Sequence, residues 1–173
     1  IEARVQEQAR LAIAEADVLF IESTYGDRAH KDQAATVDEL AQVIEHTLNV
    51  KHGNVIVPAF AVGRTQEVLY QLHRLSREGR LRNLHIHVDS PMAAAATRIT
   101  MQHLELFDEP ARRLADWRAA GRNLPLLRFT ASVEESMALN QLKAGAIIVA
   151  ASGMCDAGRI KHHLRHNLGR AEC

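Results

Sequence analysis

The feature that most constrains the fold is a repeated unit in which a short apolar run stops at a cluster of polar and small residues. The run at 18–21 ends in ESTYGDR (22–28), and the run at 55–58 opens into AFAVGRTQE. The runs at 85–89 and 147–151 end in SPMAAAAT and SGMCDAGR. Apolar runs are typical of strands buried in a parallel sheet, and α/β folds place their chemistry beyond the carboxyl ends of such strands. The four clusters predict one shared functional edge.

Segments with helical spacing of apolar residues alternate with these runs, which predicts a three-layer α/β/α sandwich. We expect strands at 18–21, 55–57, 84–88, 126–130 and 146–150. Helices are expected at 2–15, 36–50, 65–77, 91–103, 108–121 and 157–167. This alternation favours right-handed crossovers and a mainly parallel, Rossmann-like sheet of about five strands. Ser132 with Glu135 predicts a capped helix start between the last two strands.

The composition fits a single domain spanning all 173 residues, of which 47% are hydrophobic and can form one core. No run approaches the roughly 18 apolar residues that cross a membrane, and the amino end does not resemble a cleaved signal. We therefore expect a cytoplasmic protein without a membrane partner. Two cysteines make no disulfide framework. With 21 basic and 21 acidic residues, net charge alone does not indicate nucleic-acid binding, although the carboxyl-terminal end is basic.

Glu22 stands at the end of the first expected strand, where a carboxylate serves either as a loop cap or in a functional network. Asp27 and Arg28 follow closely, which favours a network that orients catalytic or metal-bound groups. Ser23 and Thr24 add hydroxyl groups able to hold phosphate oxygens or neighbouring backbone. This cluster is the first candidate site.

The stretch PAFAVGRTQE (58–67) combines a glycine, an arginine and a helix start. Gly63 permits an unusual backbone angle, the first N–H groups of a helix favour an anion, and Arg64 offers a forked donor suited to phosphate. Thr65 could instead cap its own helix, and the two interpretations are compatible. The patterns GxxxxGK[ST] and GxGxxG are absent, which disfavours a nucleotide site.

Two further strand-to-helix turns carry hydroxyl and N–H groups, at 89–91 and 152–154. Taken singly, each is compatible with ordinary turn chemistry. Taken with the clusters above, Ser90, Ser152 and Gly153 become candidates for the same edge.

The ten histidines do not form a recognisable metal motif, because HxHxDH, HExxH and a zinc-like CxxC are all absent. His162 and His163 are adjacent and point about 100° apart on a helix, so we expect surface positions for both. His85 and His87 share one strand face and are expected to be packed rather than metal-bound. A complete metal site within this chain is not expected.

Together these motifs closely resemble the β-CASP segment of metallo-β-lactamase-fold RNA-processing nucleases. The likeness covers about residues 16–172 in the expected order and is strongest to the bacterial and archaeal branch, similar to the endonuclease subunit of pre-mRNA 3′-end cleavage. It rests on ESTYGDR (22–28), PAFAVGRTQE (58–67), VDSP (88–91), SVEESMALNQL (132–142) and ASGMCDAGRIKHHL (151–164).

In that family the β-CASP segment is inserted into a metallo-β-lactamase domain, two zinc ions lie at the domain interface, and RNA passes between the domains. The resemblance implies that Glu22 is a catalytic acid which orients a histidine of the other domain. It also implies that the helix-start and loop positions contact RNA phosphates. The candidate substrate-binding residues are Ser23, Thr24, Arg28, Arg64, Ser90, Ser152, Gly153 and Arg159.

The zinc-binding motifs of the family are missing from these 173 residues, and residues 1–16 read as an atypical helix. We therefore expect an excised insert that has no cofactor of its own and is inactive alone, whose intact parent carries two zinc ions. The missing domain is then its natural partner, and the surface that it leaves uncovered could pair two copies as a homodimer. A neutral charge and few aromatic residues keep an alternative open, a stand-alone protein- or anion-binding module.

Overall fold

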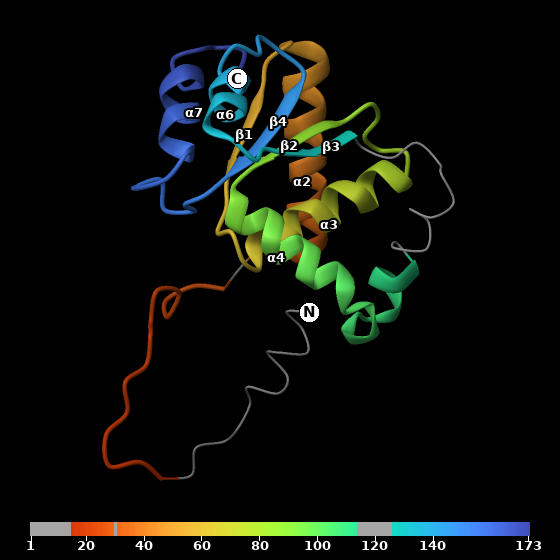
Figure 1. The fold of residues 1–173 in the computed structure, drawn as a ribbon. Helices are drawn as coiled ribbons and strands as arrows, with labels where there is room; N and C mark the ends of the chain where they lie inside the picture. The colour runs from red at the N-terminus through yellow and green to blue at the C-terminus, as the bar shows by residue number, and fades with distance from the viewer. Residues whose placement is uncertain (1–14, 30, 114–125) are drawn as a thin grey trace.

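The computed structural model describes residues 15–29, 31–113 and 126–173. Four strands form one parallel sheet in the spatial order β1-β4-β2-β3, as Figure 1 shows. All four carboxyl ends therefore lie at one edge of the sheet, which we call the C-edge. The strands are β1 (Val55–Pro58), β2 (His85–Asp89), β3 (Leu126–Phe129) and β4 (Ala146–Ala150).

Helices cover both faces of the sheet, which confirms the predicted three-layer sandwich. In Figure 1, α2 and α3 lie on one face, and α6 and α7 on the other. The helices are α2 (Gln33–Glu45), continued by a π-helical turn (His46–Val50), α3 (Arg64–Arg77), α4 (Pro91–Gln102) followed by a 3₁₀ turn (Leu104–Leu106), α6 (Val133–Leu139) and α7 (Ile160–Asn167). In the described part of the chain, no helix combines the length and apolarity that crossing a membrane requires.

The core lies mainly between the sheet and α2–α4. Leu72 and Leu75 of α3 are almost fully buried there against Ile86 and Val88 of β2, and burying each leucine contributes about 1.5–3 kcal/mol. A smaller cluster on the other face packs Leu139 of α6 on β4. Because strand side chains alternate between faces, Asp89 points away from Val88 and toward the layer of α6 and α7.

Helix starts follow the predicted chemistry. The Ser132 hydroxyl accepts the N–H of Glu135, and the Glu135 carboxylate accepts the N–H of Ser132, a complete capping box that confirms the prediction. The Ser90 hydroxyl accepts the Ala93 N–H at the start of α4, where Pro91 lacks only an N–H that would have no helical partner.

The prediction of a strand at 18–21 is wrong, and the described sheet has four strands instead of about five. Val18, Leu19, Phe20 and Ile21 are 71%, 61%, 93% and 80% exposed. A strand needs a neighbouring strand to share its main-chain hydrogen bonds, and none of β1–β4 pairs with this segment. The apolar run therefore lies outside the sheet.

Two predicted helices fall largely outside the described residues. The helix at 2–15, within the atypical segment 1–16, is described only from residue 15 onward. Of the helix at 108–121, residues 109–113 are helical, and Asp108 accepts the Ala111 N–H at its start.

Candidate functional site

The loops that leave β1 and β4 lie against each other at the C-edge. Ala59 N donates to Ala150 O over 3.0 Å, extending the strand pairing by one residue. A Cβ atom added to Gly153 would lie 3.1 Å from Cδ2 of Phe60. Glycine at 153 therefore permits the two loops, 59–63 and 151–158, to meet.

Arg64 begins α3 directly after the first of these loops. Gly63 adopts φ +83°, as predicted, and its N–H donates to Gln66 Oε1 over 2.7 Å. The Arg64 side chain is 54% exposed and its Nη1 lies 2.5 Å from Glu67 Oε2. The start of α3 thus presents a guanidinium group at the C-edge, paired with a carboxylate of its own helix.

Thr65 does not cap its own helix. Its hydroxyl donates to the Phe60 carbonyl over 2.8 Å, and the side chain is buried. The reason is the position of the helix start, because Gly63 already occupies the N-cap. Thr65 closes the loop between β1 and α3.

The loop after β4 is held by its own hydrogen bonds. Ser152 N donates to Ala157 O over 3.1 Å, and Ser152 Oγ donates to Asp156 Oδ1 over 2.7 Å. This side-chain bond is the main cause that lowers the pKa of Asp156. Gly158, at φ +78°, closes the turn, and a Cβ there would overlap the Ala151 carbonyl oxygen. The turn fixes where α7 begins.

A buried cluster around Asp89 joins the end of β2 to α6 and α7. Arg159 Nη1 donates to Asp89 Oδ1 over 2.7 Å, and Ser136 Oγ donates to Oδ2 over 2.5 Å. His163 Nε2 lies 2.7 Å from the same Oδ2, and its Nδ1 lies 2.9 Å from Asn140 Oδ1. We call these five residues the Asp89 cluster; it ties three elements together beneath the C-edge.

Asp89 is ionised in this cluster although it is fully buried. Burial alone would raise its pKa, but the hydrogen bonds from His163, Ser136 and Arg159 outweigh burial and lower it to about 2. A carboxylate that accepts several hydrogen bonds favours its charged form. The cluster therefore holds a negative charge directly behind Arg159.

The predictions for four histidines can be compared with the structure. His163 is completely buried, so the expected surface position is wrong for it and right only for the exposed His162. Helix α7 turns one side toward the sheet, and residue 163 lies on that side. His85 is exposed rather than packed because it begins β2, whereas His87 is half-buried. Burial, followed by the charge of Arg128, lowers the pKa of His87.

The structure brings most predicted contact residues to the C-edge. Ser152 and Gly153 lie on the second of the two touching loops, Arg64 directly follows the first, and Arg159 follows the second with its side chain 24% exposed. Ser90 also lies at this edge, yet it is 7% exposed and its hydroxyl caps α4. In the structure, Ser90 supports the helix start.

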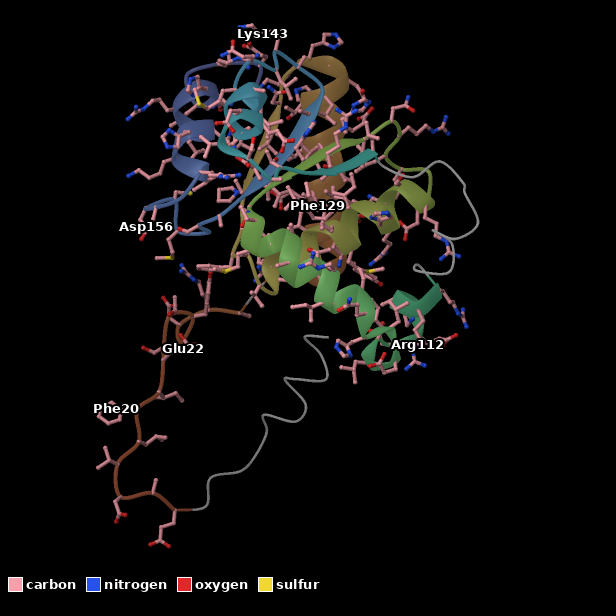
Figure 2. The ribbon with its side chains drawn as sticks, in the orientation of Figure 1. Phe20, Glu22, Arg112, Phe129, Lys143 and Asp156 are labelled. Carbon is pink, nitrogen blue, oxygen red and sulfur yellow. The ribbon has the colours of Figure 1, made fainter. Side chains whose placement is uncertain are left out.

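The candidates from the first cluster lie elsewhere. Figure 2 shows Glu22 on an extended segment that leads away from the α/β body. Its carboxylate accepts the Thr24 N–H over 2.9 Å, and the carbonyl of Ser23 accepts the Gly26 N–H in a tight turn. The guanidinium of Arg28 lies 5.2 Å from the ring centre of Tyr25. These four candidates, Glu22, Ser23, Thr24 and Arg28, form a second group separate from the C-edge.

Among the described residues, no group of three or more His, Cys, Asp or Glu side chains could hold a metal ion. The zinc pair implied by the family resemblance therefore does not fit any donor set in this part of the chain. Cys155 and Cys173 are unpaired thiols.

Comparison with known proteins settles the family. The model of the Beta-Casp domain family matches residues 65–173, well over half of the chain. This chain belongs to the β-CASP family. The match includes β2, β3, β4 and the whole Asp89 cluster, so these β-CASP elements carry the family's sequence pattern.

Several β-CASP relatives bear the names of ribonucleases. The chain is 37% identical over 158 residues to Ribonuclease TTHA0252 of Thermus thermophilus, covering 88% of this chain and 35% of that protein. It is 31% identical to the RNase J-like protein of Methanocaldococcus jannaschii, covering 88% and 35%. It is 28% identical to Endoribonuclease ysh1 of Schizosaccharomyces pombe, covering 88% and 20%. The chain thus spans about a third or less of these relatives.

The Asp89 cluster was missed from the sequence, although one signal for it exists. Asp89 ends an apolar strand on the face it shares with His85 and His87, and Arg159 and His163 stand four residues apart. This spacing places two side chains on the same side of a helix. What the sequence lacks is the strand order that sets α7 beside the end of β2.

Proposed function

We propose that this chain is the RNA-holding half of a metal-dependent cytoplasmic ribonuclease that hydrolyses phosphodiester bonds. The observation that supports this most is the contact of the loops 59–63 and 151–158, which gathers Arg64, the Ser152–Gly153 backbone and Arg159 at one edge. The ribonuclease names of the relatives support the reaction class.

The C-edge suits a phosphate backbone better than a base sequence. Guanidinium groups and backbone N–H groups contact phosphates, which positions nucleic acid without reading its sequence. The Arg64–Glu67 pair is exposed, and exposed pairs contribute only about 0–1 kcal/mol. A phosphate can therefore replace Glu67 beside Arg64 at small cost. Arg159 differs because buried Asp89 holds it in place.

The metal chemistry belongs to another part of the parent protein in this proposal. The family resemblance implies two zinc ions, and the described residues offer no ligand set for them. The zinc pair would supply the activated water and the charge stabilisation. This chain's contribution is to hold the RNA backbone and, through Glu22, to orient a histidine of the metallo-β-lactamase domain.

The exposed run Val18–Ile21 supports a docked partner domain. Four consecutive apolar side chains, each more than 60% exposed, are unfavourable in water and mark an interaction surface. We propose that this run packs on the metallo-β-lactamase domain and thereby carries Glu22 to the catalytic centre. The same run is what favours the second candidate function, a protein-interaction module without nuclease activity.

A comparison of the 173-residue chain with its full-length parent tests the proposal. Each is incubated with labelled single-stranded RNA, with and without added Zn²⁺, and each is titrated with RNA at several salt concentrations. We expect cleavage by the parent only, and weak, salt-sensitive RNA binding by the chain. Cleavage by the chain itself would refute the assignment of the metal to the other domain. A parent that neither binds nor cleaves RNA would favour the interaction module.

A further inference from the structure

The outer side of α7 carries a shallow hollow next to the C-edge. It has a volume of about 460 Å³ and is lined by Gly158, Arg159, Lys161, His162 and Arg165. Apart from the glycine, each lining residue carries a cationic or imidazole side chain, and no carboxylate takes part. We call this hollow the α7 basic surface.

Helix α7 is divided into a buried side and this basic side. Ile160, His163 and Asn167 are buried toward the sheet, whereas Lys161 and Arg165 are exposed. Residues four apart lie one above the other on a helix, about 6 Å apart along its axis. Lys161 and Arg165 therefore form a row that runs away from Arg159.

Two of the cations of this surface, Lys161 and Arg165, have no carboxylate partner among the described residues. The chain has 21 basic and 21 acidic residues overall, yet residues 157–171 contain four Lys or Arg and no Asp or Glu. The exposed arginines at the start and end of α3 differ in this respect, because Arg64 pairs with Glu67 and Arg74 with Glu78. Asp156, in the loop before α7, accepts a hydrogen bond from the Ser152 hydroxyl.

We propose that the α7 basic surface binds the phosphate backbone of single-stranded RNA and continues the path of the strand beyond the C-edge. Arg159 belongs to both surfaces, because Asp89 holds its guanidinium at the C-edge and its side chain also lines the hollow. An open row of cations fits a linear polyanion, whereas a single small anion would need enclosed donors that the hollow does not have. The proposal extends the RNA-holding function and rests on it.

Such a surface adds affinity without adding sequence preference. Each phosphate neutralised on a single strand changes the slope of log K against log salt by about 0.7. Contacts from Lys161 and Arg165 would thus contribute a slope of roughly 1.4. Only an RNA long enough to reach past Arg159 would gain from them, so the two side chains should affect long oligonucleotides and leave short ones unchanged.

The test is a salt titration of the full-length parent with short and long fluorescent oligouridylates. Lys161→Gln combined with Arg165→Gln removes two charges from the surface. A matched control, Arg82→Gln with Lys143→Gln, removes two exposed charges near the amino ends of β2 and β4. Figure 2 shows Lys143 at the top of the α/β body and Asp156 at its lower left.

For the variant with Lys161→Gln and Arg165→Gln, the proposal predicts that the slope of log K against log salt falls by about 1.4 with the long RNA only. The slope of the control variant should not change. If the parent binds RNA but both variants keep its slope, the α7 proposal is wrong and the proposed function stands. If the parent does not bind RNA at all, both are wrong. If polyglutamate of matched charge displaces the long RNA as well as unlabelled RNA does, the surface binds an acidic protein instead and the RNA proposal is wrong.

Discussion

Asp89 Oδ2 lies 2.7 Å from His163 Nε2, and both side chains are completely removed from solvent. The two residues are 74 positions apart in the chain, so their contact closes the space between the end of β2 and α7. Arg159 and Ser136 donate further hydrogen bonds to the same carboxylate. This contact connects the stability of the domain to the position of an arginine proposed to hold RNA.

Replacing Asp89 by Asn should destabilise the domain strongly. The variant leaves Arg159 and His163 without their carboxylate partner, and breaking a buried ion pair costs about 3–5 kcal/mol. Urea unfolding followed by circular dichroism measures this loss. Asp27→Asn is the control, because Asp27 is exposed and its contact with Arg28 is 4.0 Å long. Equal stability of the two variants would contradict a structural role for the cluster.

The stabilisation from Asp89 should depend on pH in the acid range. The pKa of Asp89 is about 2 in the folded chain against an ordinary 3.8, so the ionised group stabilises the folded state above about pH 4. This contribution, on the order of 2 kcal/mol, is lost as the pH falls through about 2. The difference in unfolding free energy between the unsubstituted chain and Asp89→Asn should therefore shrink as the pH falls from about 4 to about 2. A difference that stays constant would rule out the lowered pKa.

Substitutions at two glycines allow the cost of a positive φ to be measured separately from the cost of a steric overlap. Gly158 and Gly79 both have positive φ, +78° and +73°, but only at Gly158 would a Cβ meet neighbouring atoms, the Ala151 backbone. Gly79→Ala should cost about 1 kcal/mol from conformation alone. Gly158→Ala should cost about 2 kcal/mol more, because the added Cβ would overlap the Ala151 backbone. Comparable melting temperatures for the two variants would show that the turn after β4 can move.

Removing the guanidinium of Arg64 should weaken RNA binding without unfolding the domain. Charged hydrogen bonds contribute about 1.5–3 kcal/mol, so Arg64→Ala should lower RNA affinity of the full-length parent about tenfold or more. Arg74→Ala serves as the control, since Arg74 lies on the same helix and pairs with Glu78. Unchanged affinity in a salt-controlled titration would remove Arg64 from the RNA path.

Glu22→Gln should reduce turnover more than affinity in the full-length parent. The substitution keeps the shape of the side chain and removes the charge that is proposed to orient a histidine of the partner domain. A residue that acts on positioning changes kcat, whereas RNA binding remains. Steady-state kinetics and anisotropy titrations distinguish the two effects. Identical kcat values for the variant and its parent would exclude this role.

The fold could be predicted because each element carries a local signal. The runs at 55–58, 85–89 and 146–150 are apolar enough to be read as buried strands, and Ser132 marks a helix start by its spacing to Glu135. The run at 18–21 has the same local signal, but strand formation also requires a neighbouring strand. Such long-range information is absent from a short stretch of sequence.

The candidate site was predictable only in part, for a related reason. Arg64, Ser152 and Gly153 follow strand ends, and parallel strands bring their ends together whatever their order. The partners of Asp89 depend on which helix lies beside β2, and that in turn depends on the order β1-β4-β2-β3. His163 shows the consequence, since its burial follows from the way α7 is turned toward the sheet.

The central position of β4 also has a consequence for biosynthesis. Among the four described strands, β4 comes last in the sequence, and both β1 and β2 pair with it and not with each other. A nascent chain that has not yet reached residue 146 can join β2 to β3 but leaves β1 without a neighbour. Completion of the four-stranded sheet must therefore wait until β4 has left the ribosome, and topologies with such distant pairings fold slowly.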